Sequence, residues 1–219
     1  GNGKIYMAHK GKTWFKITVK GAQAHGSMPW TGIDAIVGIS EVVLGIKRRI
    51  DALPTDETFG QSSVCFGTIQ GGFNTNVVAE SATITLDMRL APPLTSEGSL
   101  QLVDEAIKEA CEKVPGLTGS YEVIARRPYV LQNDDSLLLK ELQACIKEVT
   151  GKYAQTEVCT GYTDSGVVAA ETGNGNCMSY GPTGMNFHQP NESVDLDSVL
   201  ETYEISRKIV YRMGFEIDE

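Results

Sequence analysis

The chain has 219 residues and a formal net charge of −9, with the apolar, aromatic and charged fractions of an ordinary globular protein. The acidic balance argues against a nucleic-acid partner, because phosphate binding needs clustered Lys and Arg and the only tight basic run is residues 47–49. Polar residues interrupt every apolar run, so no membrane span is expected. Five widely spaced cysteines are typical of free thiols, which predicts a cytoplasmic protein.

The first half of the chain has the pattern of a four-stranded sheet with two helices. Apolar and polar residues alternate over residues 14–20, which predicts a half-buried strand, and residues 34–49 have helical spacing. Further elements are expected as strands at 63–69, 82–90 and 121–125 and a helix at 100–114. This order is that of the ferredoxin-like βαββαβ fold, in which both helices cover one face of the sheet. We place this domain at residues 11–127.

The helix expected at residues 34–49 carries two apolar stripes. The stripe assigned to the sheet consists of Ile33, Ile36, Val37, Val43 and Leu44. A second stripe contains Ile39, Val42 and Ile46. Because one apolar face is enough to cover a sheet, the second stripe predicts a partner, and a charged residue at position 42 is expected to favour the monomer.

The second half has an α/β pattern after a hinge at residues 127–129. Helices are expected at 138–149 and 196–213 with a shorter one between them, and strands at 156–159 and 177–180. Two strands cannot bury three amphipathic helices. The region at 128–219 is therefore expected to belong to a larger doubly wound sheet and to expose apolar surface by itself.

Two Gly- and Pro-rich segments each contain a histidine, His25 in residues 24–29 and His188 in residues 181–192. Taken alone, a loop histidine is more often a turn or capping residue than a catalytic group. The pair of segments, however, resembles the family of dinuclear-zinc metallopeptidases and amidohydrolases that contains acetylornithine deacetylase, succinyl-diaminopimelate desuccinylase and glutamate carboxypeptidase. The resemblance extends over nearly the whole chain.

The resemblance implies an α+β architecture in three parts. Residues 1–10 would lead in from a catalytic half that lies upstream, residues 11–127 would form a ferredoxin-like dimerisation (lid) domain, and residues 128–219 would form the C-terminal portion of an α/β zinc-peptidase catalytic domain. It also implies a homodimer through the lid.

The resemblance implies separate roles for the two histidines. His25 would reach from one subunit into the active site of the other and donate a hydrogen bond to the oxygen of the scissile carbonyl. His188 would be a zinc ligand, in a segment that also matches the family at Gly181, Pro182, Asn191 and Glu192. For Glu192 we favour a plain role at the start of the following helix.

Four further residues are candidates for binding a small amino-acid-like substrate. Asn76 lies in a segment similar to the family's Gly-Gly-x-x-x-Asn-Val-x-Pro, with Ala79 in place of the proline, and a plain turn residue is the alternative. Arg89 matches an Asp-x-Arg pattern and could clamp a carboxylate, the alternative being a cross-strand ion pair. Thr163 lies in a variant of the family's Gly-Thr-Ser-Asp-Ala and could instead cap a helix. Gly184 would let the backbone approach the substrate closely.

The resemblance implies a hydrolase with two zinc ions, with Co or Mn as alternatives. A catalytic zinc needs about three protein ligands, and this sequence has neither a His-x-Asp pair nor adjacent glutamates. At most His188 would bind metal here, so the chain alone is expected to be inactive. The whole enzyme would hydrolyse the amide bond of N-acyl amino acids, of the succinyl-diaminopimelate or acetylornithine type, or of small peptides. The alternatives are a di- or tripeptidase or carboxypeptidase of the same family, and a non-catalytic ferredoxin-like module that dimerises or binds a small ligand.

Overall fold

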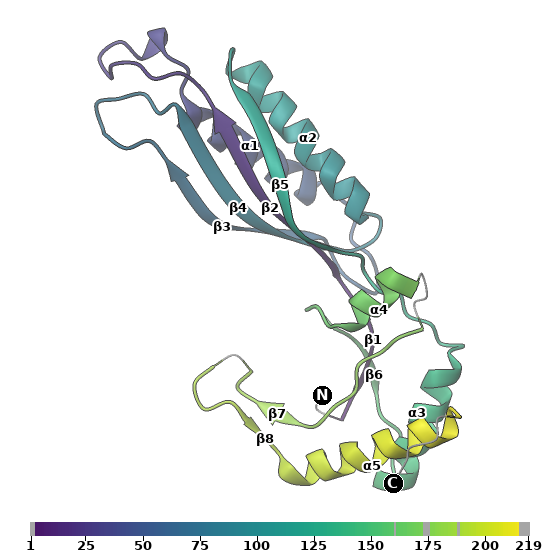
Figure 1. The fold of residues 1–219 in the computed structure, drawn as a ribbon. Helices are drawn as coiled ribbons and strands as arrows, with labels where there is room; N and C mark the ends of the chain where they lie inside the picture. Colours follow the sequence, from purple (N-terminus) through teal and green to yellow (C-terminus); the bar gives the residue numbers. More distant parts are fainter. Residues whose placement is uncertain (1–2, 160, 173–175, 188, 215–219) are drawn as a thin grey trace. The chain divides into compact units, whose positions relative to one another are not determined.

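A computed structural model describes residues 3–159, 161–172, 176–187 and 189–214 of the chain (Figure 1). The chain divides into two compact units, one formed by Lys10–Tyr129 and the other by Gly1–His9 together with Val130–Glu219. The lid domain expected at residues 11–127 falls inside the first unit. No helix among these described residues is long and apolar enough to cross a membrane.

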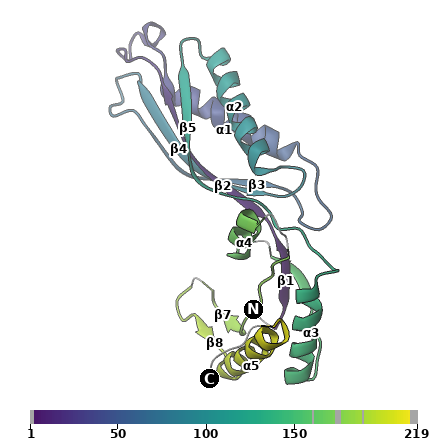
Figure 2. The same cartoon turned by 45° about the vertical axis from the view of Figure 1, so that its right-hand side comes forward.

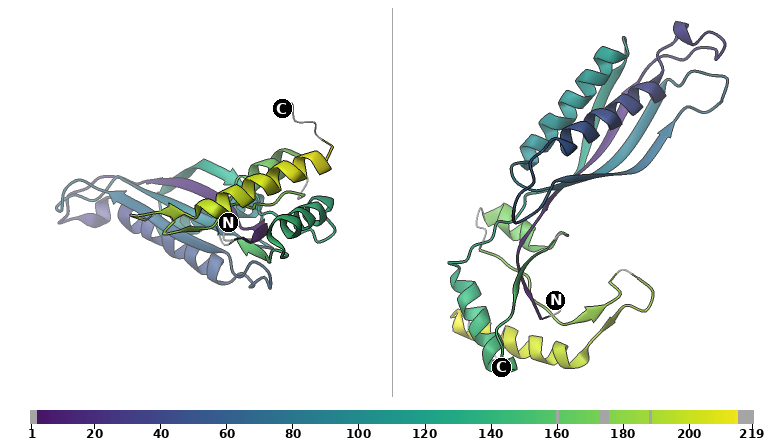
Figure 3. Two further views of the ribbon diagram at one scale, coloured as in Figure 1. Left: turned by 90° about the horizontal axis from the view of Figure 1, so that it is seen from below. Right: turned by 180° about the vertical axis from the view of Figure 1, so that it is seen from behind.

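The unit Lys10–Tyr129 is a four-stranded antiparallel sheet with two helices on one face. The strands are β2 (Gly11–Lys20), β3 (Ser63–Gly71), β4 (Ser81–Leu90) and β5 (Thr118–Arg127), in the spatial order β3-β4-β2-β5. The helices are α1 (Ala35–Asp51) and α2 (Ser96–Lys113), and the short 3-10 helix η1 (Pro29–Thr31) precedes α1. Figure 3 shows both long helices lying along the same face of the sheet. The predicted ferredoxin-like order is therefore confirmed.

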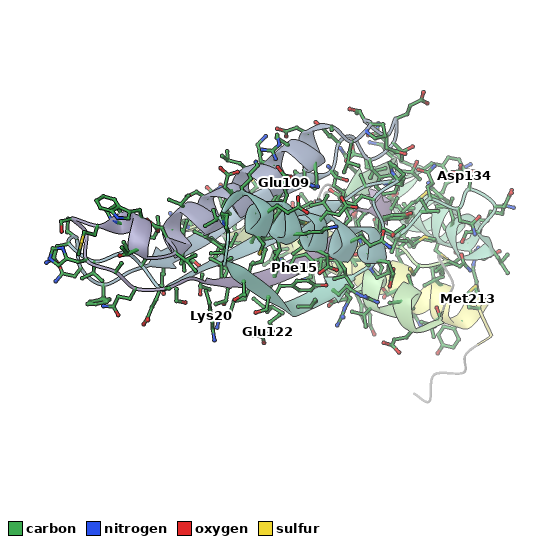
Figure 4. All side chains as sticks on the ribbon, turned by 90° about the horizontal axis from the view of Figure 1, so that it is seen from above. Phe15, Lys20, Glu109, Glu122, Asp134 and Met213 are labelled. Atoms are coloured by element: carbon green, nitrogen blue, oxygen red, sulfur yellow. The ribbon has the colours of Figure 1, made fainter. Side chains whose placement is uncertain are left out.

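Alternation along the strands builds the core of this unit. On β4 the residues Ile84, Leu86 and Met88 are buried beneath the helices, as the period of two predicts. Figure 4 shows Glu109 on the helical side of the sheet and Lys20 and Glu122 on the opposite side. Side-chain caps fix where the helices begin: the Asp34 carboxylate accepts from two N–H groups of α1, and the Thr95 hydroxyl accepts from the N–H of Gly98 in α2.

The structure reverses the predicted roles of the two apolar stripes of α1: the stripe assigned to a partner faces the core, and most of the stripe assigned to the sheet is exposed. Ile39, Val42 and Ile46 are fully buried in the core, whereas Ile36, Val37 and Leu44 are 45, 50 and 52% exposed. The reason is that small residues complete the buried face: a Cβ at Gly38 would lie 2.5 Å from Leu117. A pattern that counts only large apolar residues overlooks this contribution.

Among its described residues, the second unit has three helices and a short parallel sheet. β1 (Ile5–His9) pairs in parallel with β6 (Thr156–Cys159). The helices are α3 (Leu137–Thr150), α4 (Ser165–Thr172) and α5 (Leu196–Arg212), and Figure 2 shows α3 and α5 side by side. A hairpin of β7 (Gly184–Met185) and β8 (Ser193–Val194) leads into α5. The strand expected at 177–180 is wrong: only Ser179 makes a bridge, to Tyr6 of β1.

The core of the second unit is small. Its cluster of buried residues consists of Ile5, Met7, Leu142, Cys145, Ile146 and Ile205. By contrast, α5 exposes an apolar stripe at helical spacing, with Leu196 74%, Leu200 65% and Tyr203 61% exposed. The expected exposure of apolar surface in this region is therefore confirmed.

Candidate functional site

The structure brings His25 and Asn76 together at one end of the sheet. Strands β2 and β4 pair as far as Lys20, which faces Ser81. Beyond the strands the antiparallel pairing resumes with its register shifted by one residue, and His25 forms a bridge with Val77. The amide of Gly26 donates to the carbonyl oxygen of Asn76 over 2.7 Å. A Cβ at Gly26 would lie 2.9 Å from that same carbonyl, so the close approach requires glycine. We call residues 24–31 and 73–78 the tip.

The His25 ring is exposed but held by its neighbour. The backbone N–H of Ser27 donates to His25 Nδ1 over 3.1 Å, and Ser27 Oγ lies 2.8 Å from the same nitrogen. The N–H of Met28 donates to the His25 carbonyl oxygen over 2.8 Å, which closes the turn. Both contacts on the ring involve Nδ1, at one end of the imidazole.

The tip also carries large apolar side chains that are exposed to solvent. Trp30 is 78% exposed, Phe73 74% and Met28 48%. Exposed aromatic residues of this size are uncommon on a surface that only meets water, and they are enriched where a protein contacts a partner. The tip therefore combines a polar ring with an apolar rim.

Arg89 lies at the other end of the sheet from His25 and Asn76. It faces Lys12 near the start of β2, whereas the tip follows Lys20 at the end of that strand. At about 3.3 Å per residue, the span of β4 between Arg89 and Ser81 is about 26 Å. The Nε and Nη2 atoms of Arg89 donate to Asp87 Oδ2 over 3.1 and 2.8 Å. This ion pair lies along one strand, not across two strands as the alternative interpretation expected.

Thr163 belongs to the second unit, in the loop before α4. Its Oγ1 lies 2.6 Å from Ser165 Oγ and accepts from Ser179 Oγ over 3.1 Å. The hydroxyl therefore joins a chain of hydroxyl groups instead of capping the helix. The adjoining Cys177 thiol donates to the Ser165 carbonyl over 3.1 Å, and burial raises its pKa, so it is not a reactive thiolate.

Gly184 begins the β7–β8 hairpin. A Cβ at this position would lie 2.9 Å from the ring of Phe187. The hairpin borders a surface hollow of about 460 Å³ whose lining includes Gly184, Phe187 and Glu192. The cap expected of Glu192 belongs to Asp195, whose carboxylate accepts from the Ser198 N–H at the start of α5. His188 follows Phe187 in the sequence and lies outside the described residues.

The described residues do not supply a zinc centre. Across residues 3–159, 161–172, 176–187 and 189–214, no group of three or more His, Cys, Asp or Glu side chains could hold a metal ion. Because a catalytic zinc needs about three protein ligands, the described donor set does not fit that metal.

No role for His9 is predicted from the sequence, and the structure buries this side chain. His9 is 2% exposed at the end of β1, and its ring lies edge-on to Tyr162 with 5.3 Å between centroids. A Cβ at Gly166 would lie 2.8 Å from this ring. The signal in the sequence was the apolar run at residues 5–8, which is too short to tell a buried strand from a coil.

Comparison with known proteins places the first unit in a family. Residues 7–115 match the profile of the peptidase dimerisation domain of the M20 family. A probable carboxypeptidase of Ajellomyces dermatitidis is 32% identical over 131 residues, which cover 57% of this chain and 29% of that protein. A probable carboxypeptidase of Paracoccidioides lutzii is 33% identical over 126 residues, covering 55% of this chain and 27% of the relative.

Solved structures agree with this assignment at the level of the fold. The aminopeptidase PepT of Bacillus cereus has a TM-score of 0.75 at 19% identity, over 95% of this chain and 53% of that one. An M20 family metallo-carboxypeptidase of Sulfolobus solfataricus has a TM-score of 0.71 at 14% identity, over 94% and 59% of the two chains. The chain thus spans about half the length of these structures. It carries the peptidase dimerisation domain of the M20 family at residues 7–115.

Proposed function

We propose that this chain is part of a zinc-dependent M20 hydrolase that cleaves the amide bond of N-acyl amino acids or small peptides. The observation that carries the proposal is the tip, where the backbone bond from Gly26 to Asn76 brings two motifs together. A hydrogen-bond donor beside a polar amide suits a carbonyl oxygen that gains negative charge during hydrolysis. In this proposal His25 is that donor.

His25 would act in the site of a partner subunit. The apolar rim of Met28, Trp30 and Phe73 supports this, because it gives the tip a surface that a protein can cover. The homodimer itself would form along β3, one of the two edge strands of the sheet, and the adjoining flank of α1. That flank exposes Ile36, Val37 and Leu44, whereas α2 engages the charged side of α1 through ion pairs such as Arg49–Glu109.

The substrate would carry a free carboxylate. The names of the relatives as probable carboxypeptidases favour a peptide, while the resemblance to deacylases favours an N-acyl amino acid such as a succinyl or acetyl derivative. Arg89 donates to Asp87 through Nε and Nη2, so a substrate carboxylate would either accept from its remaining N–H groups or replace the carboxylate of Asp87. Thr163 and Gly184 would contribute from the second unit.

The metal would be held by His188 together with groups supplied from outside the described residues. Such a metal would supply Lewis-acid chemistry for hydrolysis. The exposed stripe on α5 supports a larger α/β domain, since Leu196, Leu200 and Tyr203 need a covering surface. The free state of all five cysteines is the observation that supports a cytoplasmic location.

The test is hydrolysis of a panel of N-acyl amino acids and dipeptides, with added zinc, by the chain alone and by the chain mixed with the amino-terminal half of a related M20 peptidase. Activity is expected only in the mixture, and His25→Ala should abolish most of it. Lys16→Ala is the control, because Lys16 is exposed on β2 and lies outside the tip.

Activity of the chain alone would contradict the proposed division of the metal ligands. Activity in the mixture that survives His25→Ala would remove His25 from the reaction. No activity in either sample would favour the alternative of a dimerisation or ligand-binding module without catalysis.

A further inference from the structure

The contacts of Ser27 determine which nitrogen of His25 can carry the proton. A neutral imidazole has one N–H donor and one acceptor nitrogen, and its partners decide which is which. The backbone amide of Ser27 can only donate, and it points at Nδ1 over 3.1 Å. A proton on Nδ1 would face the amide hydrogen at this short separation, so the amide favours the form in which Nδ1 presents its lone pair.

We propose that Ser27 is a positioning residue that holds neutral His25 in the tautomer with its proton on Nε2. The inference rests on the proposed function only for its catalytic consequence. The Ser27 hydroxyl, 2.8 Å from Nδ1, adds a second donor to the same lone pair. Ser27 therefore anchors the ring at Nδ1 and leaves the Nε2–H end for a ligand.

The tautomer decides whether His25 helps or opposes the reaction. With the proton on Nε2, the ring offers a donor to a developing oxyanion, and the enzyme need not reorganise at the moment of reaction. With the proton on Nδ1, the Nε2 lone pair would face the oxyanion and repel it. A residue that selects one tautomer thus contributes to catalysis without touching the substrate.

The backbone around Ser27 supports this arrangement. The Met28 amide donates to the His25 carbonyl and the Gly26 amide donates to the Asn76 carbonyl, so both amides flanking Ser27 are bonded. Thr31 Oγ1 donates to the Met28 carbonyl over 2.8 Å. The turn that directs the Ser27 amide at the ring is therefore fixed from both sides.

The test is nitrogen NMR of the chain labelled with ¹⁵N-histidine at about pH 8, where imidazoles are neutral. The His25 signals are assigned by their loss in His25→Gln. The expected result is an unprotonated Nδ1 and a protonated Nε2 at the limiting shifts of a single tautomer. Shifts averaged between two tautomers, or a protonated Nδ1, would overturn the inference.

Two variants separate the hydroxyl from the backbone. Ser27→Ala removes the hydroxyl but keeps the backbone N–H, so it should weaken the preference for the Nε2 tautomer and move the shifts partway from the limit toward averaged values, while Ser27→Thr keeps a hydroxyl and should leave them at the limit. If Ser27→Ala leaves the spectrum unchanged, the backbone alone sets the tautomer and the proposal that the Ser27 side chain positions the ring is overturned.

The catalytic consequence is measured in the complemented enzyme. Loss of one ordinary hydrogen bond corresponds to a decrease in kcat of about 2- to 10-fold for Ser27→Ala, with KM unchanged and with recovery in Ser27→Thr. A single tautomer combined with full activity of His25→Ala would refute the proposed function and leave the tautomer assignment intact. A mixture of tautomers combined with loss of activity in His25→Ala would do the reverse.

Discussion

Replacing Val42 by alanine tests whether the buried stripe of α1 is part of the core of the dimerisation domain. Val42 is fully buried, with Ile39 and Ile46 beside it on the same stripe. The substitution removes two methyl groups from a packed site. At about 0.8 kcal/mol for each buried carbon, plus a term for the cavity that is left, the expected loss of unfolding free energy is about 2 kcal/mol.

The assay is thermal and denaturant unfolding of the chain at several protein concentrations, because association stabilises a folded dimer by mass action. For a domain of this size, about 2 kcal/mol corresponds to a decrease in Tm of roughly 8 °C. Extrapolation to low concentration separates the stability of the fold from the contribution of the dimer.

The matched variant is Leu44→Asp, two residues along the same helix. Leu44 is 52% exposed, so a carboxylate there remains in water and the fold should keep its stability, whereas a dimer across this flank would bury an unpaired charge. Sedimentation should then show a shift toward monomer. If Val42→Ala dissociated the chain without lowering its stability, or Leu44→Asp left the sedimentation profile unchanged, the assignment of the two stripes would be refuted.

Three further changes test other parts of the structure. Gly26→Ala places a Cβ 2.9 Å from the Asn76 backbone and should cost about 1–3 kcal/mol and remove the NMR contacts between the two loops; their retention would contradict the account of the tip. Hydrogen bonds from Lys113 and Arg49 lower the pKa of Glu109 from 4.5 to about 2, so its contribution to stability is present above pH 4.5 and is lost as the pH falls toward 2. Glu109→Gln should weaken the dependence of the unfolding free energy on pH between pH 4.5 and pH 2. An unchanged pH dependence would show that other groups control the loss of stability in acid. Leu200→Glu should reduce self-association of the chain while helix content stays constant, and equal self-association would mean that the α5 stripe is not the contact surface.

The strands and helices of the dimerisation domain were predictable because local sequence patterns and tertiary packing agree there. The alternation on β4 sends Ile84 and Leu86 to the helices and leaves Thr85 on the open face, as its sequence indicates. Helix α1 begins beside Asp34, a residue suited to that position. A hydrophobic period of two residues for strands and of 3.6 residues for helices was therefore enough to predict the order of strands and helices in this domain.

The errors lie where tertiary context overrides the pattern. β1 is a strand because it pairs with β6, which follows it by more than 140 residues, and five residues have no periodicity of their own. The β7–β8 hairpin is two residues on each side, and its turn contains Asn186 and Asn191 at φ angles of 58° and 63°. The assignment of the α1 stripes failed because Gly38 gives no hydrophobic signal, although it lies against Leu117.

The pairing of the strands, and not only the sequences of the two loops, determines where the tip lies. Because the β2–β4 ladder continues to the bond between Gly26 and Asn76, the sheet determines which residues meet there. The same ladder separates the tip from Arg89 by about 26 Å or more, which exceeds the length of an N-acyl amino acid or a dipeptide. His25 and Arg89 of one dimerisation domain therefore cannot both contact the same small substrate. If both residues contact it, they must come from different subunits, so the geometry of a single sheet links the substrate hypothesis to dimerisation.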